Sequence, residues 1–137
     1  MENFKSIFEL IRSEQFRRRP AMFLGKLSIL SLAAYIEGYR MALWIHKIDE
    51  SDNLFNATKF NDFVANHYNR SAEAGWMNNI WAENYGDEAQ SFKTFFILFD
   101  EFIKEKKDYN FYYHLMSLYT GKLNQNELRF EDYKILK

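Results

Sequence analysis

The sequence of 137 residues contains no cysteine, one proline and only five glycines. Without cysteine, the chain can form neither a disulfide nor a thiolate metal site, which suits a reducing compartment. So little proline and glycine argues against an all-β chain, because such a chain needs many tight turns. No stretch approaches 18 uncharged apolar residues, so we expect no membrane-spanning segment and no membrane partner.

The chain also lacks an excess of charge of either sign. Its 18 Lys and Arg residues nearly balance its 19 Asp and Glu residues, which leaves a formal net charge of −1. Such a balance gives no general attraction to nucleic acid or anionic lipid, and we expect no nucleic-acid partner. The first residues have neither the basic start nor the apolar run of a secretory signal. We therefore expect a cytoplasmic protein.

Aromatic residues, by contrast, are abundant, with 14 Phe, 9 Tyr and 3 Trp. Each aromatic side chain can bury about 150–250 Å², so a modest number of them can dominate a core. Those that remain exposed would favour a protein-binding surface. Composition leaves both interpretations open.

Apolar residues recur mainly with the 3.6-residue period of α-helices, which predicts an all-α fold. We expect one compact bundle of five to six helices over residues 1–137, with an irregular C-terminal tail from about residue 122 to 137. The helix over 28–47 is apolar on most faces, so we place it at the centre of the core together with the Phe-rich helix that follows residue 87. The predicted helices cover about residues 4–18, 28–47, 57–69, 76–85, 88–104 and 109–119.

Two helix starts carry capping residues. Ser28 precedes the second predicted helix and can accept a hydrogen bond from its free backbone N–H groups. Asp87 precedes the fifth, and Gln90 follows it at the spacing of a capping box. Both positions predict sharp helix N-termini.

Catalytic and metal-binding patterns are not recognisable in the sequence. None of the three histidines, His46, His67 and His114, pairs with another at metal-ligand spacing, and we expect no metal and no cofactor. Carboxylates such as Asp100 and Glu101 are adjacent, so a helix points them in different directions, and we expect most such carboxylates to form a solvated face. We expect no enzyme. A small hydrolase with dispersed carboxylates stays as the catalytic alternative, and would need two acidic side chains within about 5–10 Å in a pocket.

Arg17, Arg18 and Arg19 form the densest cluster of charge. They could bind phosphate or an acidic partner, because arginine suits bidentate recognition. They could equally cap the end of the first helix and pair with nearby Asp or Glu. We favour the structural interpretation.

The segment that follows is a distinctive apolar connection between two predicted helices. Pro20 fixes one backbone dihedral and Gly25 releases the chain into the next helix. We predict that it is a buried link, with Arg19 held by a carbonyl or a carboxylate. The structural residues of this motif are Arg19, Pro20, Met22, Phe23, Leu24 and Gly25.

A related Arg-Pro-x-Met-Tyr-Ile-Gly occurs in the ATPase domain of DNA gyrase and its relatives. That family needs an Asn on the following helix for magnesium and a later Asp-x-Gly-x-Gly loop for adenine. Residues 31–39 contain no Asn, and no such glycine loop follows in this sequence. We therefore exclude ATP binding of that kind.

The motif more closely resembles that of a group of small bacterial proteins associated with polymorphic-toxin and contact-dependent inhibition loci. The resemblance extends over Ser28-Ile-x-x-Leu32, Tyr35-Ile-x-Gly-Tyr39, Phe63, Gly75-Trp76 and Ala89-x-x-Phe92-x-x-Phe95-Phe96. It covers roughly residues 4–103 and implies an immunity protein, which neutralises a cognate toxin by stoichiometric binding.

A toxin's active site often binds phosphate, so we expect an acidic and aromatic surface to face such a partner. The alternative is a small homodimeric regulatory or assembly protein that associates through its Phe-rich helices. The candidate partner-binding residues are Asp49, Glu50, Asp52, Trp76, Trp81, Glu83, Tyr85, Asp87 and Glu88.

Overall fold

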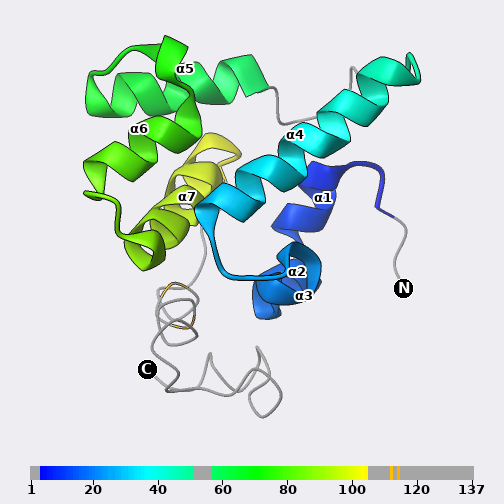
Figure 1. The fold of residues 1–137 in the computed structure, drawn as a ribbon, viewed down its shortest axis with the longest axis horizontal. Coiled ribbons are helices and arrows are strands. Elements are labelled where there is room, and N and C mark those ends of the chain that lie inside the picture. The colour runs from blue at the N-terminus through cyan, green and yellow to red at the C-terminus, as the bar shows by residue number, and fades with distance from the viewer. Residues whose placement is uncertain (1–3, 51–56, 105–111, 113, 115–137) are drawn as a thin grey trace.

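The computed structural model describes residues 4–50, 57–104, 112 and 114, and all regular structure in these ranges is helical. The all-α prediction is therefore confirmed. Most of the helix predicted over 109–119, the tail 122–137 and Asp52 lie outside the described residues, although Tyr112 and His114 are helical. The elements are α1 (Ile7–Arg12), α2 (Glu14–Arg18), α3 (Pro20–Leu24), α4 (Ile29–Ile45), α5 (Ala57–Tyr68), η1 (Ala72–Ala74), α6 (Trp76–Glu83) and α7 (Glu88–Phe102) (Figure 1).

The first helix is broken in two at Ser13, so the prediction of one continuous helix was wrong. The Ser13 hydroxyl donates to the carbonyl of Leu10 at 2.6 Å, and it accepts from the backbone N–H of Phe16 at 3.2 Å. One side chain thus ends α1 and caps α2. Serine competes with helical hydrogen bonding in this way because its short side chain reaches nearby backbone groups.

Residues 20–24 form the short helix α3, at the place where the sequence predicts a buried link between two helices. Pro20 occupies the first helical position, where its fixed φ is already suitable and its missing N–H costs no hydrogen bond. Gly25 ends the helix with a φ of 82°, a conformation that favours glycine. Pro20 is buried, whereas Met22 is 69% exposed, so the motif is only partly inside the molecule.

Helix α4 starts where the sequence predicts, but only its first half lies in the core. The Ser28 hydroxyl accepts from the N–H groups of Leu30 and Ser31 at 3.1 and 3.4 Å, so the predicted cap is confirmed. The buried residues of α4 all lie in its first half and are Ile29, Leu32 and Ile36. The second half runs out to the margin of the molecule (Figure 1). The prediction that all of this helix lies at the centre was wrong.

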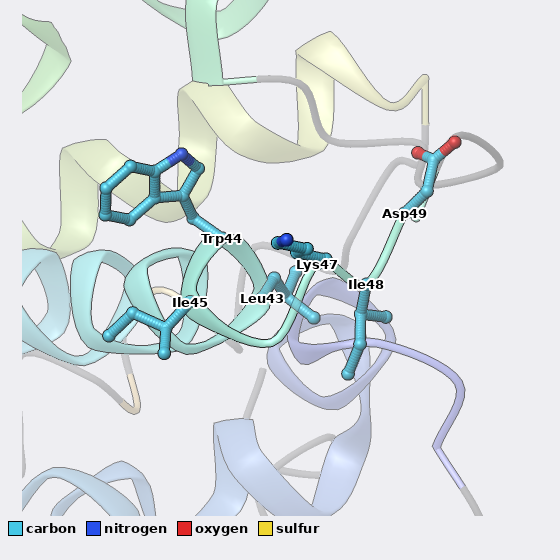
Figure 2. A pocket seen from close by; sticks show the side chains of 6 residues that line it. All are labelled: Leu43, Trp44, Ile45, Lys47, Ile48 and Asp49. Atoms are coloured by element: carbon cyan, nitrogen blue, oxygen red, sulfur yellow. The ribbon is translucent and has the colours of Figure 1, made fainter.

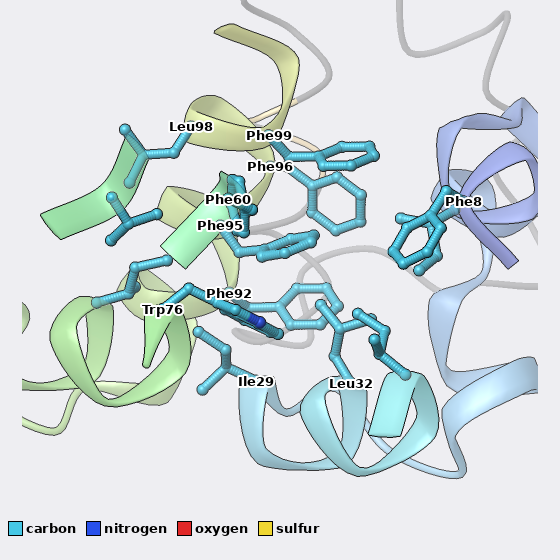
Figure 3. Packing of buried hydrophobic residues seen from close by; sticks show 14 of the residues in the cluster. Phe8, Ile29, Leu32, Phe60, Trp76, Phe92, Phe95, Phe96, Leu98 and Phe99 are labelled. Carbon is cyan, nitrogen blue, oxygen red and sulfur yellow. The ribbon is translucent and has the colours of Figure 1, made fainter. Parts of the chain in front are cut away.

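Helix α7 does lie at the centre, as its Phe periodicity predicts. Asp87 caps it by accepting from the N–H of Gln90 at 2.9 Å. Phe60 of α5 packs edge-on against rings of α7, and the ring of Trp76 lies 5.0 Å from that of Phe95 (Figure 3). The buried residues of α7 are Ser91, Phe92, Phe95, Phe96, Leu98, Phe99 and Asp100. The Phe-rich face of α7 therefore lies inside the core of the described fold.

A fully buried ion pair ties α2 to α7. Both side chains of the pair are almost inaccessible, and Arg17 donates to the two carboxylate oxygens of Asp100 at 2.9 and 2.6 Å. Arg17 also donates through Nε to the carbonyl of Ile11 at 3.3 Å, and its guanidinium lies 4.8 Å from the ring centre of Phe96. Tyr112 donates its hydroxyl to Asp100 at 2.8 Å. The structural interpretation of Arg17 is thus confirmed, and Asp100 is an exception to the expectation that most of the adjacent carboxylates are solvated.

Candidate protein-binding surfaces

The part of the chain that the structure describes contains no cluster of metal-binding side chains. No three His, Asp or Glu side chains in it come together as metal ligands. His46 and His67 are exposed, whereas His114 is buried, with Nε2 3.4 Å from the carbonyl oxygen of Arg18. Burial lowers the pKa of His114, and the contact with this carbonyl partly opposes that effect. None of the helices in these ranges has the length and apolar character needed to cross a membrane.

The turn between α6 and α7 carries the most exposed aromatic side chain of the described residues. Tyr85 is 96% exposed and has a φ of 54°, in the left-handed region that costs a non-glycine residue about 1–2 kcal/mol. Its N–H donates to the carbonyl of Ala82 at 3.1 Å, and Gly86 follows with a φ of 76°. This turn is further supported by Trp81, whose indole lies 3.6 Å from where a Cβ of Gly86 would be. The backbone thus holds Tyr85 in an outward position.

Three carboxylates flank Tyr85 along this turn. Glu83 accepts from Nε of Arg70 at 2.8 Å, in a pair whose side chains are 34% and 41% exposed. Asp87 caps α7, and Glu88 accepts from the Ser28 hydroxyl at 3.3 Å. The carboxylates are therefore positioned by local contacts and still face solvent in part. We call Glu83, Tyr85, Asp87 and Glu88 the α6–α7 turn surface.

Of the other predicted residues, Trp76, Asp49 and Glu50 do not join this surface. Trp76 is only 6% exposed and packs against Phe60, so its proposed role as an exposed anchor was wrong. Asp49 and Glu50 follow α4, on the opposite side of the molecule from the α6–α7 turn (Figure 1). Glu50 accepts a hydrogen bond from the hydroxyl of Tyr39. Burial and this contact with Glu50 raise the pKa of Tyr39 to about 12.

A second exposed surface lies at the end of α4, where sequence reasoning predicted core. Met41, Trp44, Ile45 and Ile48, which we call the α4 patch, are 52%, 76%, 60% and 56% exposed. An open pocket of about 570 Å³ at the end of α4 is lined by Leu43, Trp44, Ile45, Lys47, Ile48 and Asp49. Figure 2 shows these side chains around the end of the helix, with Trp44 and Ile45 projecting from different sides of it. An apolar patch of this kind on a water-facing helix is typical of an interaction surface.

One signal in the sequence could have revealed the α4 patch. A helix that packs against a core on one side needs only one apolar stripe. The 17-residue α4 carries apolar residues on nearly all sides, which fits either complete burial or burial on one side and a contact on the other. Only the tertiary structure distinguishes these two cases.

Comparison with known proteins adds no further assignment. No family model matches the chain, and neither a curated protein nor a solved structure matches it. The function is therefore inferred from the surfaces themselves and from the sequence resemblance.

Proposed function

We propose that the protein is a non-enzymatic binding module that neutralises a cognate bacterial toxin in the cytoplasm by stoichiometric binding. The observation that carries this proposal is Tyr85, held in an outward position between the carboxylates of Glu83 and Asp87. The resemblance of residues 19–25 and the segments after them to immunity proteins supplies the class of partner.

The α6–α7 turn surface has the chemistry needed for a tight protein contact. Tyrosine offers a large amphipathic area with few rotatable bonds, so ordering it on binding costs little entropy. The left-handed backbone of Tyr85 already fixes the direction in which its side chain leaves the main chain. Less conformational entropy is therefore lost when the side chain is ordered in an interface. The carboxylates around it would face a basic surface, and a toxin that binds nucleic acid or another phosphate has such a surface.

The role of Tyr85 is tested with the protein encoded by the adjacent gene as the binding partner, by calorimetry. Tyr85→Asn removes the ring but keeps a residue that tolerates a left-handed φ, so the fold is retained. We expect a 1:1 complex whose dissociation constant rises about 30-fold or more in this variant, as for a central aromatic anchor. Met22→Gln is the matched control, because Met22 is also an exposed apolar side chain but lies on α3.

The contribution of charge is tested separately with Asp87→Ser. Serine can replace the cap that Asp87 provides to Gln90, so this variant removes a charge without removing the helix N-cap. We expect slower association and a weaker dependence of the association rate on salt. The proposal is abandoned if the wild-type protein shows no binding to that partner at micromolar concentration, or if both variants bind as tightly as the wild type.

A further inference from the structure

The exposed face of α4 carries two small residues at and before its middle, and we call the space that they leave the hollow. Gly38 lies in the middle of this helix, and a Cβ at that position would meet no atom within 4 Å. Ala34, one turn earlier, is also exposed. Glycine in an exposed helix interior costs about 1 kcal/mol relative to alanine, and packing within the described chain does not require it. The hollow therefore needs a reason outside the described fold.

The second half of the same face contains the matching projections. Met41 and Ile45 continue from Ala34 and Gly38 with spacings of four, three and four residues, which is the seam of a helix that packs on another helix. Ile48 follows after the end of the helix, beyond the turn at Lys47. Trp44 stands beside this seam and is 76% exposed. One helix face thus carries the small residues Ala34 and Gly38 near its middle, with the exposed Leu30 before them and large apolar residues after them.

We propose that this face binds a second copy of the same chain, with the two α4 helices antiparallel. In that arrangement Ile45 of each copy lies opposite Ala34 of its partner copy, so large residues at the end of one helix pack against the small residues of the other. A parallel arrangement would instead place large against large and leave the hollow at Gly38 empty. A twofold interface uses the same patch on both copies, so a patch that carries small and large residues can be complementary to itself.

Area and charge also fit a second copy. The exposed parts of the α4 patch amount to on the order of 500 Å², so two copies would bury about 1,000 Å² in total, the lower limit for a specific interface. The nearest charges on the helix, Glu37 and Arg40, already pair with each other at 2.8 Å. Lys47 and Asp49, which lie beside Ile48, are also of opposite sign, so the charges around the face balance.

Sedimentation of the full chain, its variants and a control tests the association. We expect a reversible dimer of the wild type at about 100 μM or below. Gly38→Leu fills the hollow and should weaken the dimer about 100-fold, while the monomer gains helix stability because nothing surrounds this position. Trp44→Ser should weaken the dimer about 10-fold or more. Met22→Ser should leave it unchanged, because Met22 is an exposed apolar residue of α3.

The orientation is tested by disulfide formation, which the absence of native cysteine makes unambiguous. Oxidising a mixture of Ala34→Cys and Ile45→Cys should give mainly the mixed covalent dimer, because only an antiparallel pair brings these positions together. Self-linking of each single variant would show a parallel pair. A wild-type monomer at about 100 μM, or a dimer that Gly38→Leu leaves intact, would overturn the proposal.

Dimerisation through α4 is separable from toxin binding. The α4 patch and the α6–α7 turn surface lie on different sides of the molecule (Figure 1). A Gly38→Leu monomer that still binds the toxin would confirm dimerisation through α4 as an independent property. A Tyr85→Asn variant that still dimerises but no longer binds the toxin would show that toxin binding can be lost without loss of the dimer.

Discussion

The buried ion pair between Arg17 and Asp100 gives the sharpest quantitative prediction for the fold. Arg17 is completely buried, and its guanidinium donates to both oxygens of a carboxylate that is itself 2% exposed. Replacing Arg17 with Met keeps most of the side-chain volume but leaves the Asp100 charge buried without its partner. Breaking a buried pair in this way costs about 3–5 kcal/mol, a large share of a typical unfolding free energy of about 5–15 kcal/mol.

A double variant with two apolar side chains separates the effect of the ion pair on stability from the effect of leaving one charge unpaired. Asp100→Leu alone should cost a similar amount, because it strands the arginine. Arg17→Met/Asp100→Leu removes both charges, so we expect it to lose only about 0–2 kcal/mol, including the lost hydrogen bond from Tyr112. The coupling between the two sites would then be several kcal/mol.

Chemical denaturation of the four proteins in urea measures this cycle, provided that each unfolds in one cooperative transition. The reasoning is refuted if Arg17→Met costs less than about 1 kcal/mol, which is the range of exposed ion pairs. It is refuted equally if the double variant loses the sum of the two single losses, because additivity would mean that the charges do not interact.

Three further predictions concern single side chains. Ser28→Ala removes the cap of α4 and should lower the unfolding free energy by about 1 kcal/mol in urea denaturation. The pKa of Tyr39 is raised from 10.0 to about 12. The stability that its bound proton contributes is therefore complete below pH 10 and is lost as the pH rises toward 12. The unfolding free energy of Tyr39→Phe should depend less on pH across this range. The pKa of His114 is lowered from 6.5, so unfolding should become easier as the pH falls below 6.5, and His114→Gln should remove this part of the acid sensitivity in thermal melts.

The features that sequence predicts correctly are those with local causes. Ser28 and Asp87 cap the helices that follow them because the bonds that they make reach only two or three residues along the chain. The Phe residues of α7 share one face because of helical periodicity alone. The break at Ser13 is equally local, but the apolar pattern continues across it, so periodicity hides the change of direction.

The features that sequence misses depend on contacts between distant segments. Arg17 and Asp100 are 83 residues apart, and neither position by itself reveals that its partner is buried beside it. A hint exists, because Asp100 lies four residues after the buried Phe96 and eight after Phe92, on the face of α7 that packs inward. A carboxylate on that face needs a cation, and the arginine cluster is the densest source of one.

Helix α4 shows why hydrophobicity alone does not locate a core. Its composition predicts burial on all sides, yet the described helices cover only its first half, where Ile29, Leu32 and Ile36 lie. The part left uncovered is not a random remainder, because its exposed face combines Gly38, which the fold around it does not require, with the large projections of Trp44 and Ile45. A face that carries small and large residues side by side has the features that the proposed twofold contact requires. The same residues that mislead a prediction of the core therefore become informative once they are regarded as an interface, and Gly38→Leu, which should strengthen the monomer and break the dimer, separates the two explanations.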